Sequence, residues 1–156
     1  MKTRSATDAP VRGMILVLIA VGIIGLTTEL LLLEHTDGLN QWIPVISLGA
    51  GLAATLGVWL APGQWSLRAF RIVMFAFVVA GALGIYLHFV GNVEWARERD
   101  PRLGGVTLVW KVLTGATPVL APGALAQLGL LGLVYAWAGK RSADNAGLEQ
   151  STEADV

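Results

Sequence analysis

Four long apolar segments separated by short polar stretches dominate this chain of 156 residues. They cover residues 13–33, 42–61, 69–90 and 118–138. About 20 consecutive apolar residues are needed for a helix to cross the hydrocarbon core of a bilayer. The sequence therefore predicts an all-α protein, a four-helix transmembrane bundle within one domain that covers residues 13–141.

The composition agrees with a membrane protein. Hydrophobic residues make up 54% of the chain and charged residues only 14%, whereas a soluble domain has about 25% charged residues. The formal net charge is zero, and no basic block is large enough to indicate nucleic-acid binding. The chain has no cysteine, which excludes disulfides, thiolate metal sites, thiol nucleophiles and palmitoylation.

Two polar flanks and one long connection complete the predicted organisation. Residues 1–12 form a short basic arm, and residues 142–156 are polar and acidic, which predicts a disordered tail. The first apolar segment is too long for a signal peptide, and no A-x-A-like cleavage site follows it. Gly91 and Asn92 are expected to end the third helix. After them, apolar residues at helical spacing predict a short amphipathic helix on the membrane surface before the fourth span: Leu103, Val106, Trp110 and Leu113.

The distribution of lysine and arginine predicts the orientation, because these residues favour cytoplasmic loops. Seven of the eleven basic residues fall in three regions that four spans would place on one side: Lys2, Arg4, Arg12, Arg68, Arg71, Lys140 and Arg141. The third connection is the exception, with four basic residues between Arg97 and Lys111. We therefore expect both termini in the cytoplasm.

Two segments carry the same triplet of two glycines and one ionisable residue. Gly22, Gly25 and Glu29 share one face of the first span, and Gly81, Gly84 and His88 share one face of the third. Small residues allow membrane helices to approach closely. If these two helix-packing faces meet in register, Glu29 and His88 lie at the same depth near the outer end of the bundle.

The same alignment pairs His35 with Glu94, and Glu34 lies beside them in sequence. An ionisable group inside a membrane is costly unless it has a partner, a proton or access to water. We therefore interpret these residues as a ligand or proton site: Glu29, His88, Glu34, His35 and Glu94.

Several interpretations of this site stay open. It could be a buried polar contact that only fixes helix packing. It could be a metal site in which His35 and His88 join the carboxylates, with bis-histidine haem as a variant. It could serve proton-coupled transport or the binding of a lipophilic molecule such as a quinone, and four spans would then favour a homodimer. The third connection could dock an accessory subunit to a larger complex, although a solvated loop explains its charges as well.

A further motif surrounds Pro118 and Pro122, near the start of the fourth span. Two prolines four residues apart could leave carbonyls unpaired at the mouth of a broken helix. Prolines in the first turn of an ordinary helix are the simpler interpretation. Gln127 lies deeper in this span and could donate a hydrogen bond across the bundle.

Four segments resemble a family of small uncharacterised bacterial membrane proteins: Glu29-Leu-Leu-Leu-Leu-Glu-His35, Gln41-Trp-Ile-Pro44, Gly91-Asn-Val-Glu94 and Gly115-Ala-Thr-Pro-Val-Leu-Ala-Pro-Gly123. The resemblance covers all four spans and implies a bacterial cytoplasmic (inner) membrane, without an activity. The chain contains no phosphate-binding glycine loop, catalytic triad or zincin helix. We therefore expect a membrane protein with a structural or ligand-binding role and not an enzyme, with no cofactor strongly implied. The alternative is a proton-coupled carrier or a metal- or quinone-binding subunit.

Overall fold

The computed structural model describes the backbone of residues 5–34, 38–115 and 118–154, and side chains between Pro10 and Ala138 apart from those two gaps and Asn40. The described residues form helices and connections without a strand. The helices are α1 (Ser5–Leu32), α2 (Leu39–Leu60), α3 (Gln64–Arg99), α4 (Gly105–Leu113) and α5 (Gly123–Ala154). The expected all-α class is confirmed.

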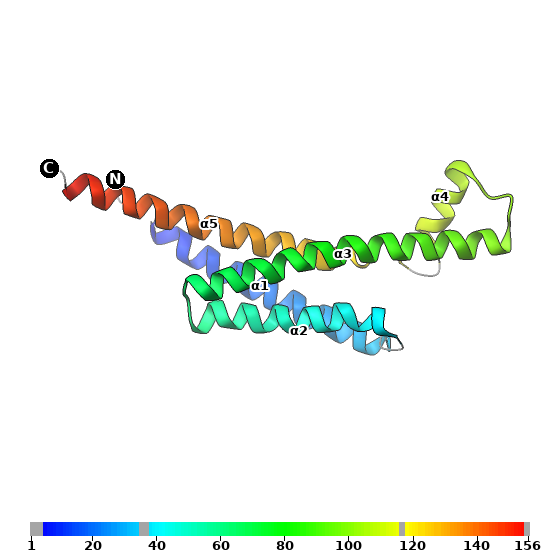
Figure 1. Cartoon of the computed structure of the whole chain (residues 1–156), viewed down its shortest axis with the longest axis horizontal. Coiled ribbons are helices and arrows are strands. Elements are labelled where there is room, and N and C mark those ends of the chain that lie inside the picture. Colours follow the sequence, from blue (N-terminus) through cyan, green and yellow to red (C-terminus); the bar gives the residue numbers. More distant parts are fainter. Residues whose placement is uncertain (1–4, 35–37, 116–117, 155–156) are drawn as a thin grey trace.

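The four long helices run along one another (Figure 1), and their pairwise contacts close a ring. Neighbouring pairs are α1 and α2, α2 and α3, α3 and α5, and α5 and α1. Short connections make consecutive helices antiparallel neighbours in such a bundle. Consequently α1 and α3, which run in the same direction, occupy diagonal positions and are separated by α2 on one side and α5 on the other.

The core of the ring combines large side chains with glycines on the facing helix. The ring of Phe77 lies against Gly51 of α2, and Met74 and Phe77 lie against Gly129 of α5. Glycine allows this approach because it has no Cβ, and close van der Waals packing drives helix association in lipid. The large side chains that this core buries completely are Ile19, Ile23, Leu48, Phe70, Met74 and Phe77.

Three helices are long and apolar enough to cross a membrane: Pro10–Leu32, Gln41–Leu60 and Gln64–Arg99. Most large apolar side chains on their outward faces are exposed in the isolated chain, as expected for surfaces that face lipid. The protein is therefore a multi-pass helical membrane protein. The apolar part of α5, Gly123–Ala138, is shorter, so its crossing of the membrane stays a prediction.

The third helix continues well past the point at which we expected it to end. It passes through Gly91 and Asn92 and ends at Arg99, so the expected break at this pair is wrong. A glycine inside a helix costs only about 1 kcal/mol relative to alanine, and good helix formers follow it at Glu94, Ala96 and Arg97. One glycine therefore does not stop a helix that has already formed.

Helix α4 folds back along the end of α3, and the two form what we call the projecting hairpin, residues 89–115 (Figure 1). Its small core contains Ala96, Leu108 and Val112, and Val119 from the segment before α5 packs with them. The expected short helix before the fourth span is thus present. However, it buries Leu108 and Val112 against α3, whereas Val106 and Trp110 are exposed.

The C-terminal segment also differs from the expectation. Residues 142–154, expected to be disordered, continue α5 as helix. Extending an existing helix adds one hydrogen bond per residue without a new nucleation cost, and this segment contains the good helix formers alanine, leucine, glutamate and glutamine. In the basic N-terminal arm, helix begins at Ser5.

Candidate functional site

The two glycine faces that we expected to meet both pack on α5 instead. A Cβ added at Gly22 would lie 2.6 Å from Cδ2 of Leu128, and one at Gly81 would lie 2.6 Å from the backbone nitrogen of Ala126. A Cβ at Gly84 would lie 2.7 Å from Cβ of Pro122. The expected contact between the first and third spans does not form, because these parallel helices lie on the diagonal of the ring.

Gly25 differs from the other three glycines because it does not pack. It is exposed, and no atom of another helix among the described residues lies within 4 Å of the position that its Cβ would take. The open space beside it belongs to a groove of about 380 Å³ between α1 and α5. The residues that line the groove are Gly22, Gly25, Leu26, Glu29, Ala124, Gln127, Leu128 and Leu131.

Glu29 and Gln127 are the two polar side chains of this groove. Glu29 comes from the C-terminal part of α1 and Gln127 from the beginning of α5, and both are exposed. The neighbouring hydroxyls of Thr27 and Thr28 donate their hydrogens to the helix backbone and not to Glu29. Their hydrogen bonds to the carbonyl oxygens of Ile23 and Ile24 are 2.8 Å long. The groove therefore combines apolar walls with one carboxylate and one carboxamide.

His88 has a different partner from the one we expected. Its Nδ1 lies 3.0 Å from the carbonyl oxygen of Pro118. A carbonyl only accepts hydrogen bonds, so the imidazole donates through Nδ1. His88 thereby links α3 to the chain that enters α5, and the structure does not bring it together with Glu29.

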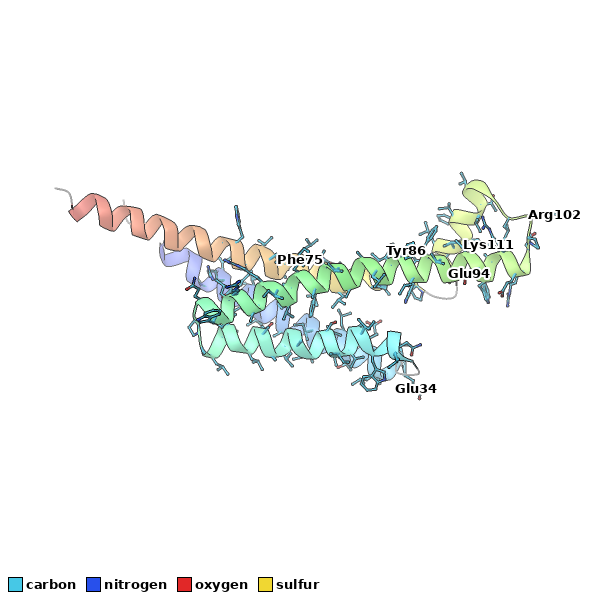
Figure 2. All side chains as sticks on the ribbon, in the orientation of Figure 1. Glu34, Phe75, Tyr86, Glu94, Arg102 and Lys111 are labelled. Atoms are coloured by element: carbon cyan, nitrogen blue, oxygen red, sulfur yellow. The ribbon has the colours of Figure 1, made fainter. Side chains whose placement is uncertain are left out.

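The other predicted site residues lie on separate elements. Glu34 follows the end of α1 with a positive φ of 49° and is exposed, while Glu94 is exposed on α3 in the projecting hairpin. Figure 2 shows these two side chains on different parts of the molecule. His35 lies outside the described residues. Within the part of the chain that the structure describes, no three histidine or carboxylate side chains gather as they would around a metal ion.

Two polar arrangements were missed from the sequence. Asn92, interpreted as the end of a helix, is buried, and its Nδ2 donates a 2.9 Å hydrogen bond to the carbonyl oxygen of Val112 in α4. At the opposite end of the bundle, Arg12 stacks on the ring of Tyr135 and Arg71 donates a hydrogen bond to the carbonyl oxygen of Ala136 in α5. Asn92 follows the third apolar segment and indicated only a helix end, and the sequence had no signal for the second arrangement.

A scan against protein-family models, a search of curated proteins and a search of solved structures each found no match for this chain.

Proposed function

We propose that this protein binds a lipophilic molecule with a polar head in the groove between α1 and α5. The observation that carries the proposal is the position of Glu29, a carboxylate within an apolar segment that opens into a groove with apolar walls. A polar group in such surroundings is costly unless a partner satisfies it. A bound head group would be that partner.

The groove's chemistry favours a particular class of ligand. An ionised carboxylate only accepts hydrogen bonds, whereas the carboxamide of Gln127 both donates and accepts them. The matching head group is therefore a donor, such as an ammonium or hydroxyl group, and its apolar body would lie along Leu26, Leu128 and Leu131. The groove volume is about 380 Å³, within the size range of small-molecule sites.

The wider setting is part of the same proposal. Helix α5 completes a four-span bundle because its apolar part packs along both α1 and α3. Both termini lie in the cytoplasm, as the excess of basic residues at that end favours. The resemblance stated above supports a bacterial cytoplasmic membrane. The role is binding and not catalysis.

Photolabelling in detergent tests the ligand class. A photoreactive long-chain alkylamine should label α1 and α5 around Glu29, and a long-chain alkanoate with the same tail should not. Glu29→Gln should reduce labelling by about ten- to a hundredfold, because a hydrogen bond to a charged group is worth about 1.5–3 kcal/mol. Equal labelling by both probes would show that the carboxylate does not select the head group.

Two glycine variants test whether the groove itself is occupied. Gly25→Leu should fill the groove and block labelling, because open space surrounds Gly25. Gly49→Leu is the matched control, since Gly49 of α2 is also exposed with open space around it but lies outside the groove. Loss of labelling in both variants, or in neither, would refute binding in the groove.

A proton-coupled carrier is the second candidate, and the same ionisable group within the Pro10–Leu32 segment favours it. If Glu29 carries the proton, reconstituted vesicles should show a proton flux that Glu29→Gln abolishes while the fold is retained. Vesicles without such a flux would leave binding as the function of the groove.

A further inference from the structure

Two arginines from different helices converge on consecutive residues of α5. The guanidinium carbon of Arg12, in α1, lies 4.6 Å from the centre of the Tyr135 ring. Nη2 of Arg71, in α3, donates a 3.0 Å hydrogen bond to the carbonyl oxygen of Ala136. Phe70 holds Tyr135 edge-on, with ring centres 5.6 Å apart. Aromatic packing and one backbone contact therefore hold two positive charges at the same turn of α5.

These guanidiniums keep most of their hydrogen-bonding capacity. Each has five N–H donors, and Arg71 uses one of them on Ala136 while Arg12 stacks on a ring face. Both side chains are partly buried. Among the described residues, neither has a carboxylate in ion-pairing range. The nearest acid in sequence is Asp8, one helical turn before Arg12, and its side chain lies outside the described part.

The position of the two arginines along the helices indicates which class of anion they suit. Arg12 stands at the beginning of the apolar segment Pro10–Leu32, and Tyr135 stands near the end of the apolar segment Gly123–Ala138. Both therefore lie at the depth where the hydrocarbon core meets the head groups. Arg68, one turn before Arg71, adds a positive charge to the same end. Basic sites between membrane helices at this level suit anionic head groups.

We propose that Arg12 and Arg71 bind the phosphate group of an anionic phospholipid at the junction of α1, α3 and α5. The planar guanidinium offers paired donors that match two phosphate oxygens. One phosphate between the two arginines would relieve their mutual repulsion and tie α1 and α3 to the same site on α5. This site is independent of the groove, which lies nearer the opposite end of the bundle.

Native mass spectrometry of the purified protein, with mixed phosphatidylglycerol and phosphatidylcholine supplied at equal amounts, tests the proposal. The expected result is one retained phosphatidylglycerol in preference to phosphatidylcholine. Arg12→Gln and Arg71→Gln should each lower the phosphatidylglycerol-bound fraction about five- to tenfold. Arg68→Gln is the matched control, because it removes the same charge from an exposed side chain that stacks on Trp65; it should change the fraction less than twofold.

Equal losses in all three variants, or no preference for phosphatidylglycerol, would overturn the proposal in favour of general surface attraction. Arg71→Gln removes a hydrogen bond between α3 and α5 and could therefore affect folding. Arg71→Lys keeps the positive charge but loses the paired N–H donors of the guanidinium, so this variant should fold and bind less lipid than the native protein. Asp8→Asn should not weaken binding, because it removes a negative charge, and a loss of binding there would count against an anion site. Inorganic phosphate in place of lipid should not bind, and saturable binding of phosphate alone would instead assign the site to a soluble anion.

Discussion

Glycines at matching positions of the two triplets have different surroundings in this protein. Gly81 is buried where a Cβ would lie 2.6 Å from the backbone nitrogen of Ala126 and 2.8 Å from the carbonyl oxygen of Pro122. Backbone atoms of a packed helix cannot move away as a flexible side chain can. Gly25 is the second glycine of its triplet and Gly84 is the second of the other, yet Gly25 faces open space whereas a Cβ at Gly84 would lie 2.7 Å from Cβ of Pro122. The local pattern is therefore equivalent, and the packing is not.

We expect Gly81→Ala to lower the free energy of unfolding by about 1–3 kcal/mol, the usual cost of overpacking a tight contact. Gly25→Ala should cost nothing or slightly stabilise α1, because alanine is the better helix former. Unfolding in detergent by increasing fractions of SDS measures both. A larger loss for Gly25→Ala than for Gly81→Ala would mean that α1, and not α3, makes the tight contact with its neighbour.

The site shows how far residue-level inference from the sequence could go. Glu29 was singled out because a carboxylate in an apolar segment needs an explanation, and the structure places it in a groove. Its expected partner His88 was chosen from matching spacing, but spacing specifies a face of a helix and not the neighbour of that face. The contacts of Arg12 with Tyr135 and of Arg71 with Ala136 had no signal, since each joins residues far apart in sequence.

At the scale of elements, the projecting hairpin is the part that hydropathy could not define. Hydropathy marks where a helix is apolar and says little about where it ends, so the polar run after Asn92 concealed the last turns of α3. Two glycines in this hairpin differ in the effect that a side chain would have: one position tests helix propensity and the other tests backbone conformation. Gly91 lies inside α3, whereas Gly105, at the first position of α4, has a φ of +58°. Open space surrounds both of them.

Gly91→Ala should stabilise the hairpin by about 1 kcal/mol through its higher helix propensity. Gly105→Ala should destabilise it by about 1–2 kcal/mol, because a side chain in the left-handed region is strained. Hydrogen exchange of the amides of α4 reports both effects, since local opening sets the exchange rate. Shifts in the same direction would show that these two glycines share one conformation.

Asn92 provides the polar link between α3 and α4 whose removal can be measured. Asn92→Ala deletes the donor to the carbonyl oxygen of Val112, and a lost hydrogen bond of this kind costs about 0.5–1.5 kcal/mol. We expect amide exchange in α4 to accelerate up to about tenfold, while α1 and α2 keep their protection. Thr107→Ala is the control, because Thr107 lies on the exposed side of α4. Unchanged exchange in Asn92→Ala would mean that apolar contacts alone hold α4.

For the whole molecule, the order of helices around the ring decides which residues can act together. The apolar segments predicted the helices because lipid requires long apolar helices, and three of these helices are long and apolar enough to cross a membrane. Neighbour relations depend on connection length and direction instead. Short connections make consecutive helices antiparallel neighbours, so the parallel helices α1 and α3 lie diagonally opposite each other in the bundle. This constraint outweighed the matching glycines and separated Glu29 from His88.

Disulfide cross-linking tests this arrangement directly, because the chain has no cysteine of its own. The pair Gly22→Cys and Leu128→Cys joins α1 to α5 at a point where the two helices touch, so it should oxidise readily in membranes. The pair Glu29→Cys and His88→Cys should not, because a disulfide requires Cα atoms within about 7 Å. Reactivity of each single cysteine towards a maleimide controls for access. Efficient cross-linking between positions 29 and 88, with none between 22 and 128, would place α1 beside α3. The groove between α1 and α5 would then not exist. The candidate site would instead be the pair formed by the carboxylate of Glu29 and the imidazole of His88.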